Sequence, residues 1–92
     1  MVTIELDDHF ALVLFAFLTR EIDDSDCKHI AAVIEHPAEF WALNTVLGAL
    51  EEQLIEPLEP NFHDLVAAAR ERVVQHSDPD GSWDYGPIIR DA

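Results

Sequence analysis

The histidines and acidic residues of this chain are the side chains whose types could do chemistry. Its 5 His residues and its 19 Asp and Glu residues are potential ligands for a metal ion. They are not spaced as ligands, because there is no H-E-x-x-H motif, no pair of histidines four residues apart and no cysteine cluster. We therefore expect no metal site and no cofactor, and a metal-dependent protein that uses His and Asp is a third hypothesis only.

The segment SDPDGSWD has the composition of a calcium-binding loop. With Gly81 at the sixth position of an EF-hand loop, position one is His76 and position twelve is Pro87, so the bidentate acid is missing. We interpret the segment as an Asp-Pro-Asp-Gly turn, which needs turn chemistry alone.

Covalent and acid–base catalysis find no support in the sequence. The serines lie in predicted caps or turns without a G-x-S-x-G elbow, and Cys27 has no histidine at a recognisable spacing. The adjacent acids Glu51 and Glu52 would point about 100° apart on a helix, which does not suit a catalytic pair. We expect a non-enzymatic protein in which Cys27 is a small structural residue.

Negative charge dominates the chain. Five Lys and Arg residues against 19 acids give a formal net charge of -14, and residues 29–69 contain no Lys or Arg. DNA, RNA and anionic membranes repel such a surface. A charged partner is therefore expected to be a basic protein.

A cluster of acids is predicted where the longest helix ends. Glu51, Glu52, Glu56 and Glu59 lie there, although negative charges are unfavourable near a helix C-terminus. One interpretation is a surface that faces a basic partner, and the other is a solvated surface that keeps the protein soluble in salt. The sequence leaves both open.

Aromatic residues flanked by acids form a second candidate binding site near the C-terminus. Trp83, Asp84 and Tyr85 make up this site, since aromatic residues are favoured anchors of interfaces. The alternative is that these residues fold back as a lid over the rest of the protein.

Hydrophobic periodicity predicts an all-α fold in a single domain. We expect a small bundle of three long helices and one short helix over residues 1–76, followed by a loose or partner-dependent C-terminal tail over residues 77–92.

Capping signals set the expected bounds of the first two helices. Asp7 or Asp8 caps the first helix, which ends near Arg20 or Ile22. Asp24 or Ser25 caps the short second helix, which ends before Pro37.

The last two helices are expected over residues 37–56 and 62–76. Pro37 suits the first turn of the third helix, and Asn61 with Asp64 gives a weak capping box for the fourth. We expect Gly48, inside the third helix, to mark a close helix crossing.

The run HFALVLFAFLT in the first helix is apolar on every side. An all-round apolar helix is typically buried, so this helix is predicted to be the centre of the bundle. The alternative is that Phe10, Leu14 and Phe17 form a self-association surface in a homodimer.

Targeting signals are not expected. The first ten residues carry acids where a secretory signal needs basic residues, and the apolar run is about half the ~20 residues that cross a bilayer. With a single Cys, the sequence predicts a cytoplasmic protein that does not bind membranes.

The runs ALVLFAFL and LGALEEQLIEPLEPNFHDLVAAARERV resemble a family of short, acidic, uncharacterised bacterial proteins. The shared features are an ALVLF helix, an EP break followed by Asn-Phe or Asn-Tyr, and an AAAR helix. The resemblance covers about two-thirds of the chain and implies a helical scaffold without a known activity. The EHP motif at residues 35–37 and the charge are also similar to those of small acidic bacterial immunity proteins.

The leading hypothesis is a non-enzymatic acidic module that masks a basic protein partner, as an antitoxin, an immunity protein or a nucleic-acid mimic does. It predicts fast, salt-sensitive association. The alternative is a structural or scaffold homodimer built on the apolar first helix.

Overall fold

The computed structural model describes residues 1–88, and these residues contain helices and extended segments but no β-strand. The α-helices are α1 (Asp8–Leu18), α2 (Pro37–Gln53) and α3 (Phe62–Ser77). Shorter elements connect and follow them: the π-helix η1 (Thr19–Asp24) and the 3-10 helices η2 (Ile30–Ala32), η3 (Glu56–Leu58) and η4 (Gly86–Ile88). The predicted all-helical character is confirmed.

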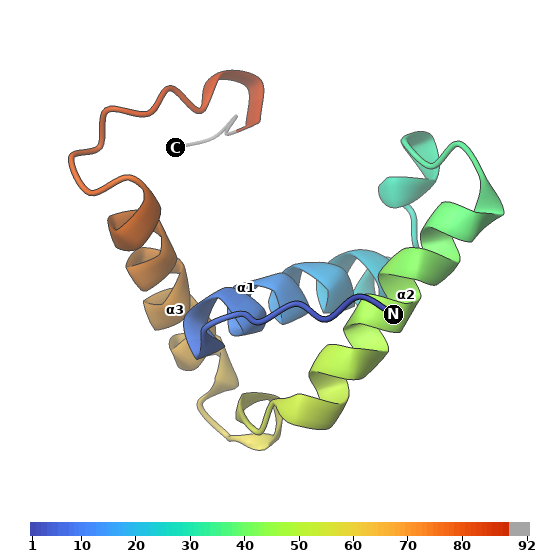
Figure 1. The fold of residues 1–92 in the computed structure, drawn as a ribbon, viewed down its shortest axis with the longest axis horizontal. Helices are drawn as coiled ribbons and strands as arrows, with labels where there is room; N and C mark the ends of the chain where they lie inside the picture. The colour runs from blue at the N-terminus through green and yellow to red at the C-terminus, as the bar shows by residue number, and fades with distance from the viewer. Residues whose placement is uncertain (89–92) are drawn as a thin grey trace.

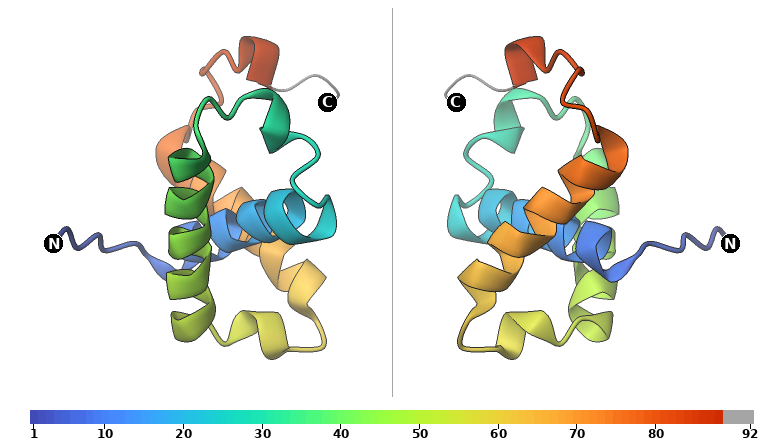
Figure 2. Two further views of the ribbon diagram at one scale, coloured as in Figure 1. Left: turned by 90° about the vertical axis from the view of Figure 1, so that its right-hand side faces the viewer. Right: turned by 90° about the vertical axis from the view of Figure 1, so that its left-hand side faces the viewer.

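Helix α1 lies between the other two helices and packs on both (Figure 1). Helices α2 and α3 diverge from their connection like the arms of a V, and α1 crosses between them, as the side views also show (Figure 2). The buried residues of the α1–α2 core are Ala11, Phe15, Leu18, Ile22, Leu47 and Leu50, and those of the α1–α3 core are Leu12, Val66 and Ala69. Helix α1 is apolar all round because it supplies side chains to both cores.

The first helix continues beyond Leu18 as the π-helix η1 and ends at Asp24 rather than near Arg20 or Ile22. Asp26 and Cys27 follow with positive φ angles of 50° and 59°, in the left-handed region that non-glycine residues rarely adopt. This turn reverses the chain before η2.

The short second helix expected before Pro37 does not form as an α-helix. The segment is a turn followed by the 3-10 helix η2. Val33 is 74% exposed, so an α-helix here would have little apolar surface to bury. A helix this short is marginal without tertiary packing.

Helix α2 starts where the sequence predicted, with Pro37 in its first turn. Nδ1 of His36 caps this helix by accepting a hydrogen bond from the Ala38 N–H at 3.0 Å. Asp7 and Asn61 do stand at the N-caps of α1 and α3, but the capping hydrogen bonds expected of their side chains are absent.

Helix α2 differs from its prediction in two further respects. It ends at Gln53, three residues before the predicted end, and the chain then forms η3 around Pro57. The expected crossing at Gly48 is wrong, because a Cβ atom placed on this glycine would meet nothing within 4 Å. None of the helices within residues 1–88 needs Gly48 for a close approach.

Candidate functional site

The predicted acidic cluster lies on the last turn of α2 and the connection from α2 to α3, a segment that we call the acidic loop (residues 51–59). Glu51 and Glu52 are exposed on the last turn of α2, Glu56 is half-buried at the start of η3, and Glu59 is exposed directly after it. Backbone hydrogen bonds from Leu58 N–H to the Ile55 carbonyl and from Glu59 N–H to the Glu56 carbonyl, both 3.0 Å, hold the loop in a tight turn.

The carboxylates of the acidic loop have no counter-ion in the described part of the chain. Neither an ion pair nor a side-chain hydrogen bond joins them to any of residues 1–88. Their charges also lie near the negative end of the α2 dipole, where acids are unfavourable. The acidic loop therefore has a negative electrostatic potential, which a bound cationic group would neutralise.

Two apolar side chains lie between these acids, and the sequence reasoning missed them. Ile55 is 68% exposed and Leu58 is 87% exposed. Their position between glutamates and directly after a helix end is the signal that could have identified them. Large apolar side chains surrounded by charge are the usual composition of a docking surface, in which the apolar groups supply the contact area.

The second predicted site, Trp83, Asp84 and Tyr85, lies beyond the C-terminal end of α3 (Figure 1). Trp83 is 66% exposed, Asp84 is exposed and accepts the Gly86 N–H at 2.9 Å, and Tyr85 is half-buried. Helix α3, about 24 Å long at 1.5 Å per residue, separates this site from the acidic loop. The structure does not bring the two predicted sites together.

Asp78 organises the described part of the predicted tail. Its carboxylate accepts hydrogen bonds from the Trp83 N–H at 3.2 Å and the Tyr85 hydroxyl at 3.1 Å. Burial and then this bond to a carboxylate raise the pKa of Tyr85 above its ordinary value. The last residues of the predicted tail, 89–92, lie outside the described residues.

The predicted self-association residues of α1 have three different environments. The Phe10 ring packs edge-on against His76, with 5.7 Å between centroids. Leu14 is half-buried against the α1–α2 core. Phe17 is 44% exposed, and the Arg20 guanidinium lies 5.2 Å from its ring centre. Of the three side chains, only Phe17 is classed as exposed.

A charged cluster at the end of α1 is a feature that sequence reasoning missed. Glu21 is only 8% exposed, and its carboxylate accepts hydrogen bonds from Arg20 Nε at 2.7 Å and His29 Nδ1 at 2.9 Å. The bond from Arg20, followed by that from His29, holds the pKa of Glu21 below its ordinary value despite the opposing effect of burial. The left-handed turn at Cys27 places His29 within reach, so the pairing depends on the backbone and not on regular spacing.

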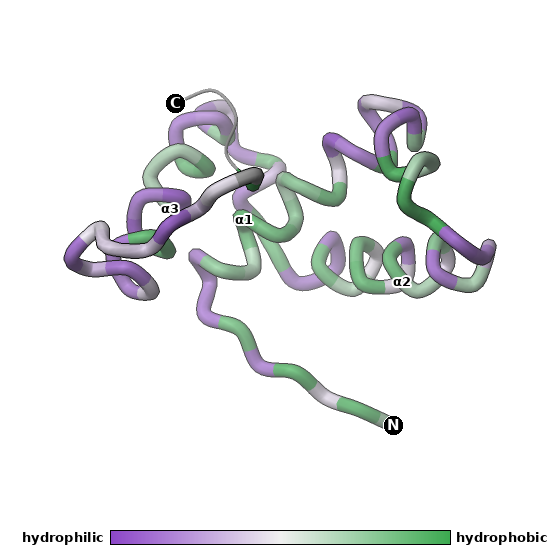
Figure 3. Tube along the Cα trace, turned by 90° about the horizontal axis from the view of Figure 1, so that it is seen from above, coloured by the Kyte–Doolittle hydropathy of each residue, from purple (hydrophilic) through white to green (hydrophobic). Residues whose placement is uncertain are grey.

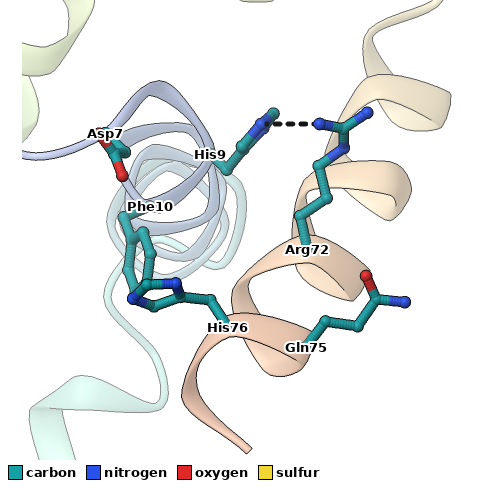
Figure 4. A pocket seen from close by; sticks show the side chains of 6 residues that line it. All are labelled: Asp7, His9, Phe10, Arg72, Gln75 and His76. Carbon is teal, nitrogen blue, oxygen red and sulfur yellow. Dashed lines mark hydrogen bonds between the residues drawn. The ribbon is translucent and has the colours of Figure 1, made fainter. Parts of the chain in front are cut away.

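An open cleft lies where the start of α1 meets the end of α3 (Figure 4). Its volume is about 370 Å³, and His9, Arg72 and His76 line it with Asp7, Phe10 and Gln75. Arg72 Nη1 lies 3.3 Å from His9 Nε2, and because arginine only donates, His9 accepts this bond. Side chains from the start of α1 and the end of α3 line this cleft together.

None of the arginines of the described chain forms an ion pair with the acidic loop. Arg20 pairs with Glu21, Arg72 contacts His9, and Arg70 lines a separate cleft with Arg20 and His63. This second cleft, of about 320 Å³, also contains Thr19, whose buried hydroxyl has no hydrogen-bond partner among residues 1–88. The contacts of these arginines lie on α1, η1 and α3 and include none of the acids of the loop.

Within residues 1–88, no group of three His, Cys, Asp or Glu residues is arranged to hold a metal ion. None of the helices in that range combines the length and the apolar character needed to cross a bilayer. No protein-family model, curated protein or solved structure matches this chain.

Proposed function

We propose that this protein is a non-enzymatic, cytoplasmic binding module that masks a basic protein partner through the acidic loop. The observation that carries the proposal is that Glu51, Glu52, Glu56 and Glu59 have no counter-ion among the described residues, while Ile55 and Leu58 stand exposed between them. The partner presents Lys or Arg side chains around an apolar contact, in the manner of a toxin or a nucleic-acid-binding protein. An antitoxin, an immunity protein and a nucleic-acid mimic all act in this way.

The two kinds of side chain have different roles in this proposal. The carboxylates steer the partner and select its charge, so they act on the association rate and its salt dependence. Ile55 and Leu58 supply apolar area that is removed from water on binding, at roughly 25 cal/mol per Å². They act on the dissociation rate.

The test begins with the tagged protein and a lysate of its own host, at low and at high salt, with mass spectrometry of the retained proteins. The purified partner is then titrated with a variant in which Glu51, Glu52, Glu56 and Glu59 are changed to Gln. We expect affinity to fall by at least ~100-fold and the salt dependence to flatten, because the steering charges are lost. Ile55→Ser and Leu58→Ser are expected to weaken binding with the salt dependence unchanged.

A matched control removes the same number of charges elsewhere, by changing Asp8, Asp23, Asp24 and Glu71 to their amides. These acids are exposed and lie outside the acidic loop. If the control weakens binding as much as the loop variant, net charge and not the loop drives the association. Binding that is indifferent to salt would contradict the proposal outright.

A further inference from the structure

Residues 1–6, which we call the arm, leave the body of the protein as an extended segment (Figures 2 and 3). Val2, Ile4 and Leu6 are 86%, 75% and 45% exposed, and they alternate with Thr3 and Glu5. No backbone hydrogen bond joins the arm to the rest of the described chain. An extended segment with free N–H and C=O groups and one apolar face is a template for pairing with another strand.

A groove of about 360 Å³ lies between the arm and α2. Its lining includes Ile4 and Leu6 from the arm, Leu14 from α1, and Val46, Ala49 and Gln53 from α2, and no charged residue contributes to it. In a chain with 26% charged residues, an uncharged groove is unusual. The groove would accept apolar side chains without bringing a carboxylate into the contact.

The chain alone exposes more surface than a compact monomer of its mass. Its accessible surface is 7506 Å², against about 5,400 Å² expected for 10.4 kDa. Its radius of gyration is 14.4 Å, against about 12 Å expected. The excess area is larger than the ~800 Å² that each partner buries in a standard interface. The arm contributes to this excess and is available to be covered.

We propose that two copies of this chain form a homodimer in which their arms pair as an antiparallel ribbon, each filling the groove of the other. A twofold axis at Ile4 pairs Val2 with the partner's Leu6 and Thr3 with the partner's Glu5. The apolar side chains of both strands then share one face, and no two carboxylates stand opposite each other. A strand pair of this length needs a helix to pack on, and α2 provides it.

Self-complementarity is the reason that the occupant is a second copy. The arm of a second copy offers a free strand edge to the arm that borders the groove, and alternating apolar side chains to α2. A basic partner would gain nothing from a groove without charge. Because each copy carries a net charge of -14, repulsion opposes the pairing at long range and added salt strengthens it. Binding of a basic partner to the acidic loop has the opposite salt dependence, so the two proposals fail independently.

Light scattering of the full chain across a concentration series tests the dimer. We expect a particle of twice 10.4 kDa whose dissociation constant decreases with added salt. Ile4→Glu should raise this constant about 100-fold, a factor of ten for each of two buried carboxylates. Thr3→Glu is the matched control, since it adds the same charge to the opposite face of the arm, and its effect should be much smaller. Circular dichroism should show both variants folded, because the arm lies outside the helices.

Disulfide trapping tests the register. In a Cys27→Ala background, Ile4→Cys places two thiols on the twofold axis, where they should oxidise rapidly to a covalent dimer, and Thr3→Cys should react much more slowly. A wild-type chain that stays monomeric overturns the proposal. So does a dimer that Ile4→Glu leaves intact and Phe17→Glu dissociates, which would place the contact on α1.

Discussion

Helices α1 and α2 carry similar apolar runs but bury them to different extents. Residues 10–18 of α1 and residues 41–50 of α2 both lack a charged side chain. Helix α1 has a neighbour on two sides, so Phe15 and Leu18 are buried. Helix α2, seen beside α1 in Figure 3, packs on it along one side only. Leu47 and Leu50 are buried on that side, whereas Trp41 and Val46 remain 62% and 41% exposed. The comparison teaches that the number of neighbours, and not apolar composition, decides whether a helix of this protein is core or surface.

The largest expected difference is in the free energy of unfolding, when one side chain of α1 and one of α2 are shortened to alanine. Leu18 is 2% exposed, so Leu18→Ala should lower the free energy of unfolding by about 2–5 kcal/mol through lost burial and a cavity. Val46→Ala on α2 should change it by about 0.5 kcal/mol or less. Urea denaturation of both variants measures the difference. Equal losses would mean that α2 is as fully covered as α1.

Acid stability should report on the charged cluster at the end of α1, which has no counterpart at the end of α2 within residues 1–88. The folded-state pKa of Glu21 lies below its ordinary 4.5, so its ionised form stabilises the fold above that pH, and this contribution is lost as pH falls through the lowered pKa. Glu21→Gln should therefore lose less stability than the wild type between neutral and strongly acidic pH. Denaturant titrations at a series of pH values measure this difference, and parallel curves for the two proteins would contradict the assignment.

The smallest expected effect is a gain in stability when Gly48 is replaced by alanine. Because a Cβ atom there meets nothing within 4 Å, Gly48→Ala should stabilise α2 by about 0.5–1 kcal/mol through helix propensity. The thermal midpoint should rise by a few degrees, roughly 4–8 °C per kcal/mol. A fall in the midpoint would show that another chain approaches α2 closely at Gly48.

Local patterns predicted the helices well and their ends less well. Apolar spacing placed α1, α2 and α3, and Pro37 correctly marked the start of α2. The expected short helix before it depended on periodicity and a capping residue, and the segment forms a turn and the 3-10 helix η2 instead. The side-chain caps expected of Asp7 and Asn61 failed because residue type does not set the rotamer that makes the bond.

The candidate site was predictable in part. The acids of the loop could be read directly as a cluster. The position of Ile55 and Leu58 between glutamates was a weaker signal, because their exposure also depends on whether another helix covers them. The Glu21–His29 pair was also hidden from the sequence, since it depends on two left-handed residues in the intervening turn.

The sequence by itself determined the helical character, the negative charge and the apolar centre of α1, because helix periodicity and charge are properties of neighbouring residues. The tertiary structure alone decided which apolar side chains stay exposed, which acids lack a counter-ion and where a groove opens beside α2. Those properties depend on which helices come alongside one another, and contacts between distant residues have no local signature in the chain.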